Sequence, residues 1–129
     1  MALRPGEAPS PRPTVTQQEG YLEAVLQPTA SSDHIKRQFE AILEICMEKK
    51  PSRLFVDFSP VTGQFTTLER YDLGMIGARL VPYVGRVAVL MSPEVQDPEK
   101  FGTQVARNRG LNVDNFVDRA QAMAWLLGD

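Results

Sequence analysis

Two short apolar runs on either side of a helical pattern do most to limit how this chain can fold. The runs are RLFVDF at residues 53–58 and RVAVLM at residues 86–91. Each is nearly continuous in apolar side chains, which is typical of a strand that is covered on both faces of its sheet. Since a helical segment separates them, the two strands are expected to pair in parallel through a right-handed crossover. The sequence therefore predicts an α/β domain.

The other predicted elements continue this alternation. The stretch TVTQQEGYLEAVLQ, residues 14–27, predicts two strands in an antiparallel hairpin around a Gln-Glu-Gly turn. The stretch LNVDNFV, residues 111–117, is more polar and predicts a short strand at or near the edge of the sheet. Apolar residues at helical spacing predict helices at about residues 29–50, 68–80, 97–110 and 118–128. The order β-β-α-β-α-β-α-β-α predicts a small mixed β-sheet with helices packed on it.

Some residues of the predicted helices carry more specific expectations. Asp97 is expected to cap the third helix, with Pro98 at its first position. Gly74 and Gly77 each cost roughly 1 kcal/mol of helix propensity. We expect glycine at both positions because a larger side chain would push the second helix off the sheet. The residues expected to anchor the terminal helix are Trp125, Leu126 and Leu127.

Composition narrows the classes of function. The chain has 129 residues, enough for one domain with one core, which is expected over residues 14–129. Four prolines predict a flexible, Pro-rich N-terminal tail over residues 1–13. A net charge of -2 and the lack of a dense basic run argue against nucleic-acid binding. The sequence has neither a membrane-spanning apolar run nor a secretory signal, so a cytoplasmic, not membrane-spanning protein is expected.

Few residues are suited to catalysis or to metal binding. The single cysteine, Cys46, excludes an internal disulfide, and with the single histidine, His34, it makes no metal cluster. Cys46 lies near the apolar stripe of a helix and is expected in the core. Asp57 stands at the end of a central strand with Ser59 nearby, a position at which α/β enzymes often place functional groups. No histidine is close in sequence to act as a base for Ser59. Walker and Rossmann phosphate motifs are absent, and no cofactor is expected.

The stretch DFSPVTGQFTTLERYDLG, residues 57–74, holds the candidate functional residues. An acidic residue ends the central strand, a loop follows, and a helical pattern begins at two threonines. Thr66 and Glu69 have the spacing of a capping box, in which each side chain accepts from a backbone amide of the other residue. Capping is the favoured role of this pair. The candidate interaction loop comprises Asp57, Ser59, Thr62, Gln64, Phe65, Thr66 and Thr67.

Three stretches give the chain a resemblance to a known family. They are RLFVDFSPVTG as central strand and loop, GRVAVLMSPE as the next strand, and NFVDRAQAMAWLLG as last strand and terminal helix. With the order of elements, they resemble the STAS family of anti-sigma factor antagonists and their relatives, and more closely its SpoIIAA-like branch, over about residues 14–128. The resemblance implies the STAS fold and a non-enzymatic module that regulates by binding a protein partner.

The resemblance also concerns the two threonines. In sporulation-type antagonists the loop after the central strand carries Asp-Ser-Ser, and a partner kinase phosphorylates a serine at the start of the next helix. Phe65, Thr66 and Thr67 stand at these positions, with Thr67 at that of the phosphoacceptor. The aspartate is absent, and LERYDLG is longer than the Gly-Leu-Gly continuation of those antagonists. The comparison therefore implies partner binding without their phospho-switch, and Thr67 is retained as a candidate phosphoacceptor.

Two alternatives to a different protein as the binding partner are a small molecule or lipid and a second copy of the chain. The alternative function is a small-molecule or lipid-binding domain with an apolar pocket, since relatives in the SpoIIAA-like branch are likened to lipid-carrier folds. The pocket would be lined by Phe65, Tyr71, Met75 and Tyr83, although core packing is the simpler explanation of these side chains. A second copy of the chain is a further candidate partner, because the hairpin or an unpaired strand edge would allow a homodimer.

Overall fold

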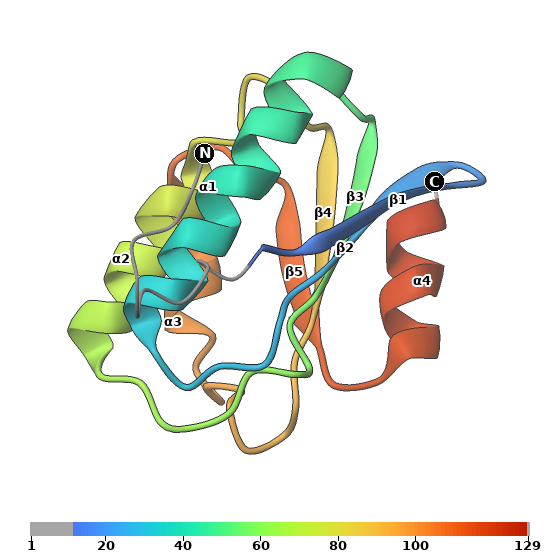
Figure 1. Ribbon diagram of the computed structural model, residues 1–129. Coiled ribbons are helices and arrows are strands. Elements are labelled where there is room, and N and C mark those ends of the chain that lie inside the picture. Colours follow the sequence, from blue (N-terminus) through green and yellow to red (C-terminus); the bar gives the residue numbers. More distant parts are fainter. Residues whose placement is uncertain (1–11, 129) are drawn as a thin grey trace.

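Five strands and four helices make up the computed structural model, which describes residues 12–128 (Figure 1). Their order is the order predicted from the sequence. The elements are β1 (Thr14–Gln18), β2 (Tyr21–Val25), α1 (Ser32–Lys49), β3 (Arg53–Asp57), α2 (Thr67–Ala78), β4 (Arg86–Leu90), α3 (Phe101–Asn108), β5 (Val113–Phe116) and α4 (Arg119–Leu127). Most of the predicted N-terminal tail, residues 1–11, lies outside the described residues.

The strands form one mixed sheet in the order β1-β2-β3-β4-β5. β1 and β2 pair antiparallel, and Gly20 makes the turn between them with a φ of +88°. The other neighbouring strands pair in parallel. β3 is therefore the central strand and β5 an edge strand, which confirms the predicted small mixed sheet.

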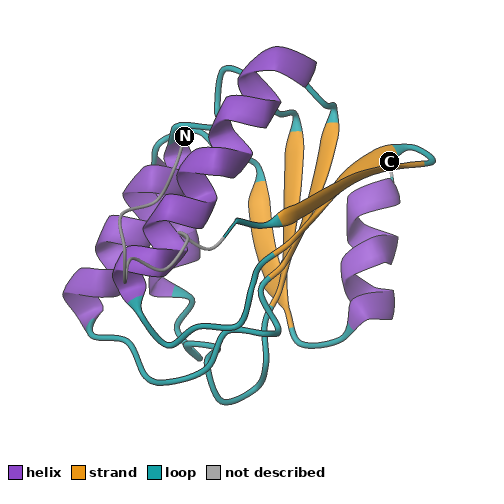
Figure 2. Cartoon of the chain, viewed as in Figure 1, coloured by secondary structure: helices purple, strands orange, loops and turns teal. Residues whose placement is uncertain are grey.

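α1, α2 and α3 cover one face of the sheet, and α4 covers the other (Figure 1). α1, α2 and α3 each connect neighbouring parallel strands, always in the same direction across the sheet. Right-handed crossovers place such helices on one face. α4 follows the last strand, so no crossover constrains it, and it packs on the opposite face against β3, β4 and β5. The loops after the parallel strands gather at one end of the sheet (Figure 2).

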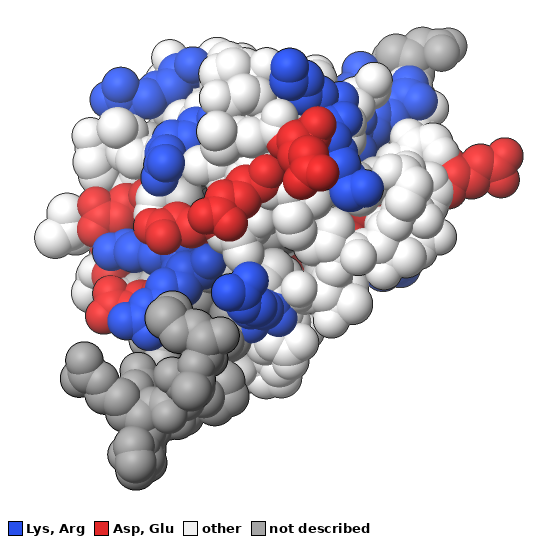
Figure 3. Space-filling view, turned by 45° about the horizontal axis from the view of Figure 1, so that its top comes forward, with Lys and Arg blue, Asp and Glu red and all other residues white. Residues whose placement is uncertain are grey.

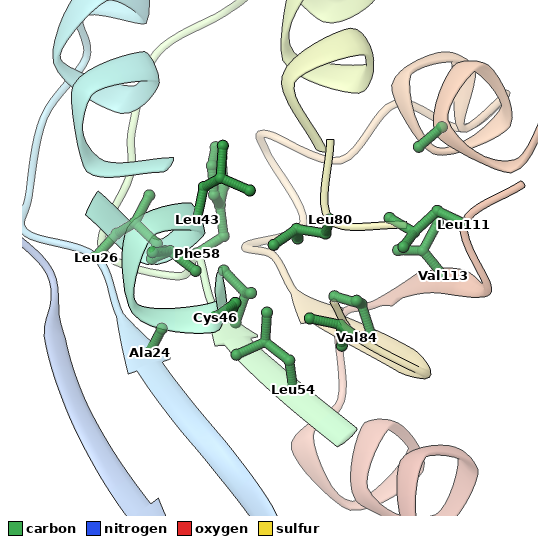
Figure 4. Packing of buried hydrophobic residues seen from close by; sticks show 14 of the residues in the cluster. Ala24, Leu26, Leu43, Cys46, Leu54, Phe58, Leu80, Val84, Leu111 and Val113 are labelled. Carbon is green, nitrogen blue, oxygen red and sulfur yellow. The ribbon is translucent and has the colours of Figure 1, made fainter. Parts of the chain in front are cut away.

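The core explains why the central strand is nearly continuous in apolar residues. Leu54 and Val56 are buried toward the three-helix layer, whereas Phe55 between them is buried toward α4. The larger core cluster fills the space where side chains of the sheet and of the three helices meet (Figure 4). The smaller cluster includes Leu126 of α4. Leu127 is exposed, so the expectation that it anchors α4 was wrong.

α1 shows how a local cap and an apolar face position a helix. The Ser31 side chain accepts from the His34 amide at 3.3 Å, and Ile35, Ile42 and Cys46 lie on the buried face. Burial raises the pKa of the Cys46 thiol to about 11, so this side chain stays protonated in the core. The predicted core position of Cys46 is confirmed.

The surface carries charges of both signs. Acidic and basic side chains are interspersed on the face drawn in Figure 3. An extended basic patch, which nucleic-acid binding would need, is not seen among the described residues of that face.

α3 begins later than predicted, at Phe101, because the residues before it close a separate turn. Asp97 accepts from the amides of Glu99 and Phe101, each at 3.1 Å. Lys100 then takes a left-handed conformation with a φ of +54°. Its Nζ lies 3.0 Å from Asp114 Oδ1, so the end of this turn is tied to β5. Asp97 therefore organises a turn ahead of the helix.

The expectation that Gly74 and Gly77 keep α2 close to the sheet was wrong. A Cβ at Gly74 would lie 2.5 Å from the carbonyl oxygen of Gly102 and 2.9 Å from Cβ of Val105, both in α3. A Cβ at Gly77 would meet no heavy atom within 4 Å. The glycine at position 74 thus permits a close crossing of α2 and α3, and the one at position 77 leaves space open.

Candidate functional site

The candidate interaction loop leaves β3 through a turn that Asp57 holds. Asp57 Oδ1 accepts from the Ser59 amide at 3.0 Å and from Ser59 Oγ at 2.6 Å. Asp57 therefore organises the start of the loop through these two hydrogen bonds. His34 and Ser59 do not form a nucleophile–base pair. His34 Nδ1 lies 3.4 Å from Thr29 Oγ1, and Ser59 Oγ donates to Asp57. The geometry at the end of β3 is therefore that of a fixed turn.

The middle of the loop is fixed to the segment that follows β2. Thr29 and Val61 form an isolated parallel β-bridge, and the Thr62 amide donates to the Thr29 carbonyl at 3.0 Å. Val61 is buried, and Gly63 takes a φ of +95° beside Ala30. The loop therefore presents its side chains on a backbone that is held at several points. The exposed candidate residues are Ser59, Thr62, Gln64, Thr66 and Thr67.

Thr66 caps α2, as predicted. Its Oγ1 accepts from the Glu69 amide at 3.1 Å, and Glu69 Oε1 accepts from the Thr66 amide at 2.9 Å. The hydrogen bond from the Thr66 amide, aided by one from Ser32, lowers the pKa of the Glu69 carboxyl. Thr67, the candidate phosphoacceptor, is exposed in the first turn of the helix. The capping box is confirmed, and phosphorylation of Thr67 stays a prediction.

α2 exposes large apolar side chains beside this cap. Leu68 is 69% exposed, and Tyr71, one turn later, is 39% exposed. Residues three apart on a helix lie on the same side, so these two side chains are neighbours. Phe65 turns inward instead and packs against the larger core cluster. We refer to Leu68 and Tyr71 as the α2 face, because they are the apolar groups that this region offers to a partner.

Cations near the α2 face are engaged with other groups of the protein. Lys36 of α1 pairs with Asp72 of α2 at 3.4 Å. Arg70 donates from Nη1 to the Val95 carbonyl at 3.2 Å, which brings the segment 92–100 against α2. The exposed acidic residues of that segment are Glu94 and Glu99. These two cations are therefore engaged, whereas neither Glu94 nor Glu99 forms an ion pair within the described residues.

A charged cluster on the opposite face of the sheet joins the loop to α4. Arg119 Nη2 lies 2.6 Å from Glu23 Oε2, and its Nη1 lies 3.8 Å from Asp57 Oδ2. The guanidinium also stacks over the Phe55 ring, 4.8 Å from its centroid. The hydrogen bond to Glu23 raises the pKa of Arg119. Because Arg119 is 51% exposed, each pair contributes under about 1 kcal/mol, and the cluster mainly orients α4.

A cavity of about 110 Å³ lies between the sheet and the three-helix layer. Of the residues predicted to line an apolar pocket, Phe65 lines this cavity, whereas Tyr71, Met75 and Tyr83 do not. Tyr71 is instead on the exposed side of α2. The predicted lining was therefore wrong for three of its four residues, and the walls of this cavity come mainly from other residues. They include Leu73, Ile76 and Gly77 of α2 and Val89 of β4, followed by Met91.

One buried polar side chain belongs to the wall of this cavity. Asn115 of β5 is 2% exposed. Its Oδ1 accepts from Thr103 Oγ1 at 3.0 Å, and its Nδ2 lies 3.6 Å from Met91 Sδ. Charged wall groups are paired elsewhere, as Lys100 is with Asp114 at 3.0 Å. The cavity is thus apolar with one amide at its edge.

The residues missed at the level of sequence are Glu23, Arg119 and Asn115. Glu23 and Arg119 are 96 positions apart, and no local pattern links them. Asn115 did leave a signal, because it occupies an inward position of β5 in alternation with buried Val113. A polar residue at an apolar position of a strand deserves notice as a buried hydrogen-bonding group.

Comparisons with known proteins do not identify a family. No protein-family model matches the chain, and no curated protein is significantly similar to it. Within residues 12–128, no group of three or more His, Cys, Asp and Glu side chains is placed to hold a metal ion. The helices of that same span are all too short or too polar to cross a membrane. Function is therefore inferred from geometry.

Proposed function

We propose that this chain is a cytoplasmic, non-enzymatic interaction module that binds a protein partner through the α2 face and the adjoining loop. The observation that carries the proposal is the exposure of Leu68, at 69%, beside Tyr71, at 39%. Apolar groups exposed side by side are typical of interaction surfaces. The start of α2, which carries both residues, lies toward the end of the sheet where the connecting loops gather (Figures 1 and 2).

The backbone beneath this surface is already held in place. The capping box fixes the first turn of α2, and the bridge between Thr29 and Val61 fixes the loop before it. A surface ordered in advance loses less conformational entropy when a partner binds. The region is therefore suited to binding without a folding step.

The charges indicate the chemistry of the partner. Lys36 is paired with Asp72, and Arg70 donates to the Val95 carbonyl, while Glu94 and Glu99 are exposed on the segment that Arg70 contacts. Complementarity then favours a partner with an apolar anchor flanked by Lys or Arg. We infer a protein segment of this kind as the occupant of the α2 face.

The resemblance to the STAS family supports the same surface. In the anti-sigma factor antagonists, the loop after the central strand and the start of the next helix form a protein–protein surface. The position of Thr67 corresponds to their phosphoacceptor, but the preceding aspartate is replaced by Phe65. We therefore propose binding that does not depend on phosphorylation.

Site-specific photo-crosslinking in cells tests this proposal. A photoreactive amino acid replaces Leu68 in one full-length variant and Met47, a 46% exposed residue of α1, in a matched control. We expect a discrete adduct with a basic protein from position 68 and not from position 47. Tyr71→Ser should weaken that adduct without unfolding the chain. Added salt should weaken it further when the crosslinking is repeated in a cell lysate.

Two results would contradict the proposal. Identical adducts from positions 68 and 47 would show that the α2 face is not selective. An adduct with twice the mass of the chain would identify a second copy as the occupant, and the inferred basic partner would then be wrong.

A further inference from the structure

The cavity between the sheet and the three-helix layer is left open at α2. Gly77 belongs to its wall, and a Cβ at this position would meet no heavy atom within 4 Å. Alanine would favour the helix at this position and would also occupy the empty space. Empty space in a core is unfavourable because the atoms that line it lose contacts. A glycine at this point is accounted for if another molecule fills the space.

The wall also holds a buried donor without a strong acceptor. The Asn115 amide has two protons to donate. Among the described residues, Met91 Sδ at 3.6 Å is the one acceptor in reach of Asn115 Nδ2, and a thioether sulfur accepts weakly. Asn115 Oδ1 is satisfied by Thr103. A buried amide donor in this state would be stabilised by an oxygen acceptor from a ligand.

Charge and size narrow the class of ligand. Lys100 is paired with Asp114, and Arg70 donates to the Val95 carbonyl, so neither cation is available to an anionic ligand. The cavity, at about 110 Å³, is smaller than the roughly 150 Å³ engineered cavity that holds benzene. A neutral molecule of about five or six non-hydrogen atoms is therefore the right size. A diacyl lipid is too large to be enclosed.

We propose that this cavity binds a small, neutral, mainly apolar carbonyl compound, such as a short ketone or aldehyde. Its oxygen accepts a hydrogen bond from Asn115 Nδ2. Its apolar part fills the space beside Gly77 and contacts Leu73. The site lies between the sheet and the three-helix layer, and neither Leu68 nor Tyr71 lines it, so each proposal can be tested without the other.

Cyclopentanone and cyclopentane are suitable probes, because they match in shape and differ in the oxygen. Each is titrated into the full chain while NMR follows the methionine methyl groups and the asparagine side-chain amides. We expect saturable shifts of the Met91 methyl and of Asn115 Nδ2 with cyclopentanone. Because the ketone also gives up its hydrogen bonds to water, the readout is the change of affinity on Asn115→Leu. Cyclopentanone should lose about tenfold in affinity, the usual effect of one neutral hydrogen bond, whereas cyclopentane should not. Met75, which does not line the cavity, serves as the internal reference.

Gly77→Leu supplies the blocking variant. Its side chain would fill the cavity, so the saturable shifts should disappear while thermal unfolding confirms that the chain is folded. Leu73→Phe is the second blocking variant if Gly77→Leu does not fold. Saturable shifts that persist in a folded blocking variant, or that are missing in the wild type, would overturn the site. Equal changes in the affinities of the two probes on Asn115→Leu would overturn the role of Asn115.

Discussion

A methyl group added at Gly74 would lie 2.5 Å from the carbonyl oxygen of Gly102 and 2.9 Å from Cβ of Val105. The nearer atom belongs to the backbone of α3, so no side-chain rotation can relieve the contact. α2 and α3 would have to move apart, and the apolar contacts around their crossing would loosen. The matched perturbation is Gly77→Ala, because this glycine is one turn further along the same helix and has open space.

The two substitutions share one energy term and differ in the other. Gly→Ala inside a helix stabilises it by about 1 kcal/mol. Overpacking of a closed interface costs about 1–3 kcal/mol, and the upper part of that range applies to a rigid backbone contact. Gly74→Ala should therefore lower the free energy of unfolding by about 2 kcal/mol, the difference between these terms. Gly77→Ala should raise it by about 1 kcal/mol.

Urea unfolding followed by far-UV circular dichroism measures both effects. With a slope of about 1–3 kcal/mol per molar urea, a gap of about 3 kcal/mol separates the two midpoints by roughly 1–3 M. The wild type should lie between the variants. If Gly74→Ala were as stable as Gly77→Ala, the close crossing of α2 and α3 at Gly74 would be refuted.

Three further predictions concern groups with defined local chemistry. Thr66→Ala should lower the free energy of unfolding by about 1 kcal/mol through loss of the cap, whereas Thr67→Val should leave both stability and crosslinking through the α2 face unchanged. Acid should destabilise the fold, because the contributions of Glu69 and Asp97 are complete above their unfolded pKa values, about 4.3 and 3.9, and are lost as the pH falls through their lower folded values. Thermal midpoints measured from pH 6 down to pH 2.5 should show this loss. In Glu69→Gln the midpoint should fall less steeply with pH, and an unchanged pH dependence would contradict the role given to Glu69. Cys46, with its pKa raised to about 11 by burial, should react with a thiol reagent at the rate at which the chain opens, so that rapid labelling of the native protein would contradict its core position.

Much of the architecture can be predicted because the signals act within one element or between neighbours in the chain. The apolar run of β3 predicts its central position, and the spacing of Thr66 and Glu69 predicts the capping box that forms. The start of α3 could not be predicted in this way. Asp97 and Pro98 have the residue types of a helix start, yet Asp97 closes a turn and Lys100 is held by Asp114 in β5.

The candidate site likewise has features that the sequence predicts and features that it does not. The sequence by itself determined the order of the elements, the loop after β3 and the cap of α2, because hydrogen bonds and apolar periodicity over a few residues set them. Only the tertiary structure decided that Leu68 stays exposed while Phe65 turns inward, and that Gly74 meets α3. It also decided where the cavity beside Asn115 lies. These features depend on how closely whole helices approach each other and the sheet, and that distance results from the packing of many side chains that are distant in sequence.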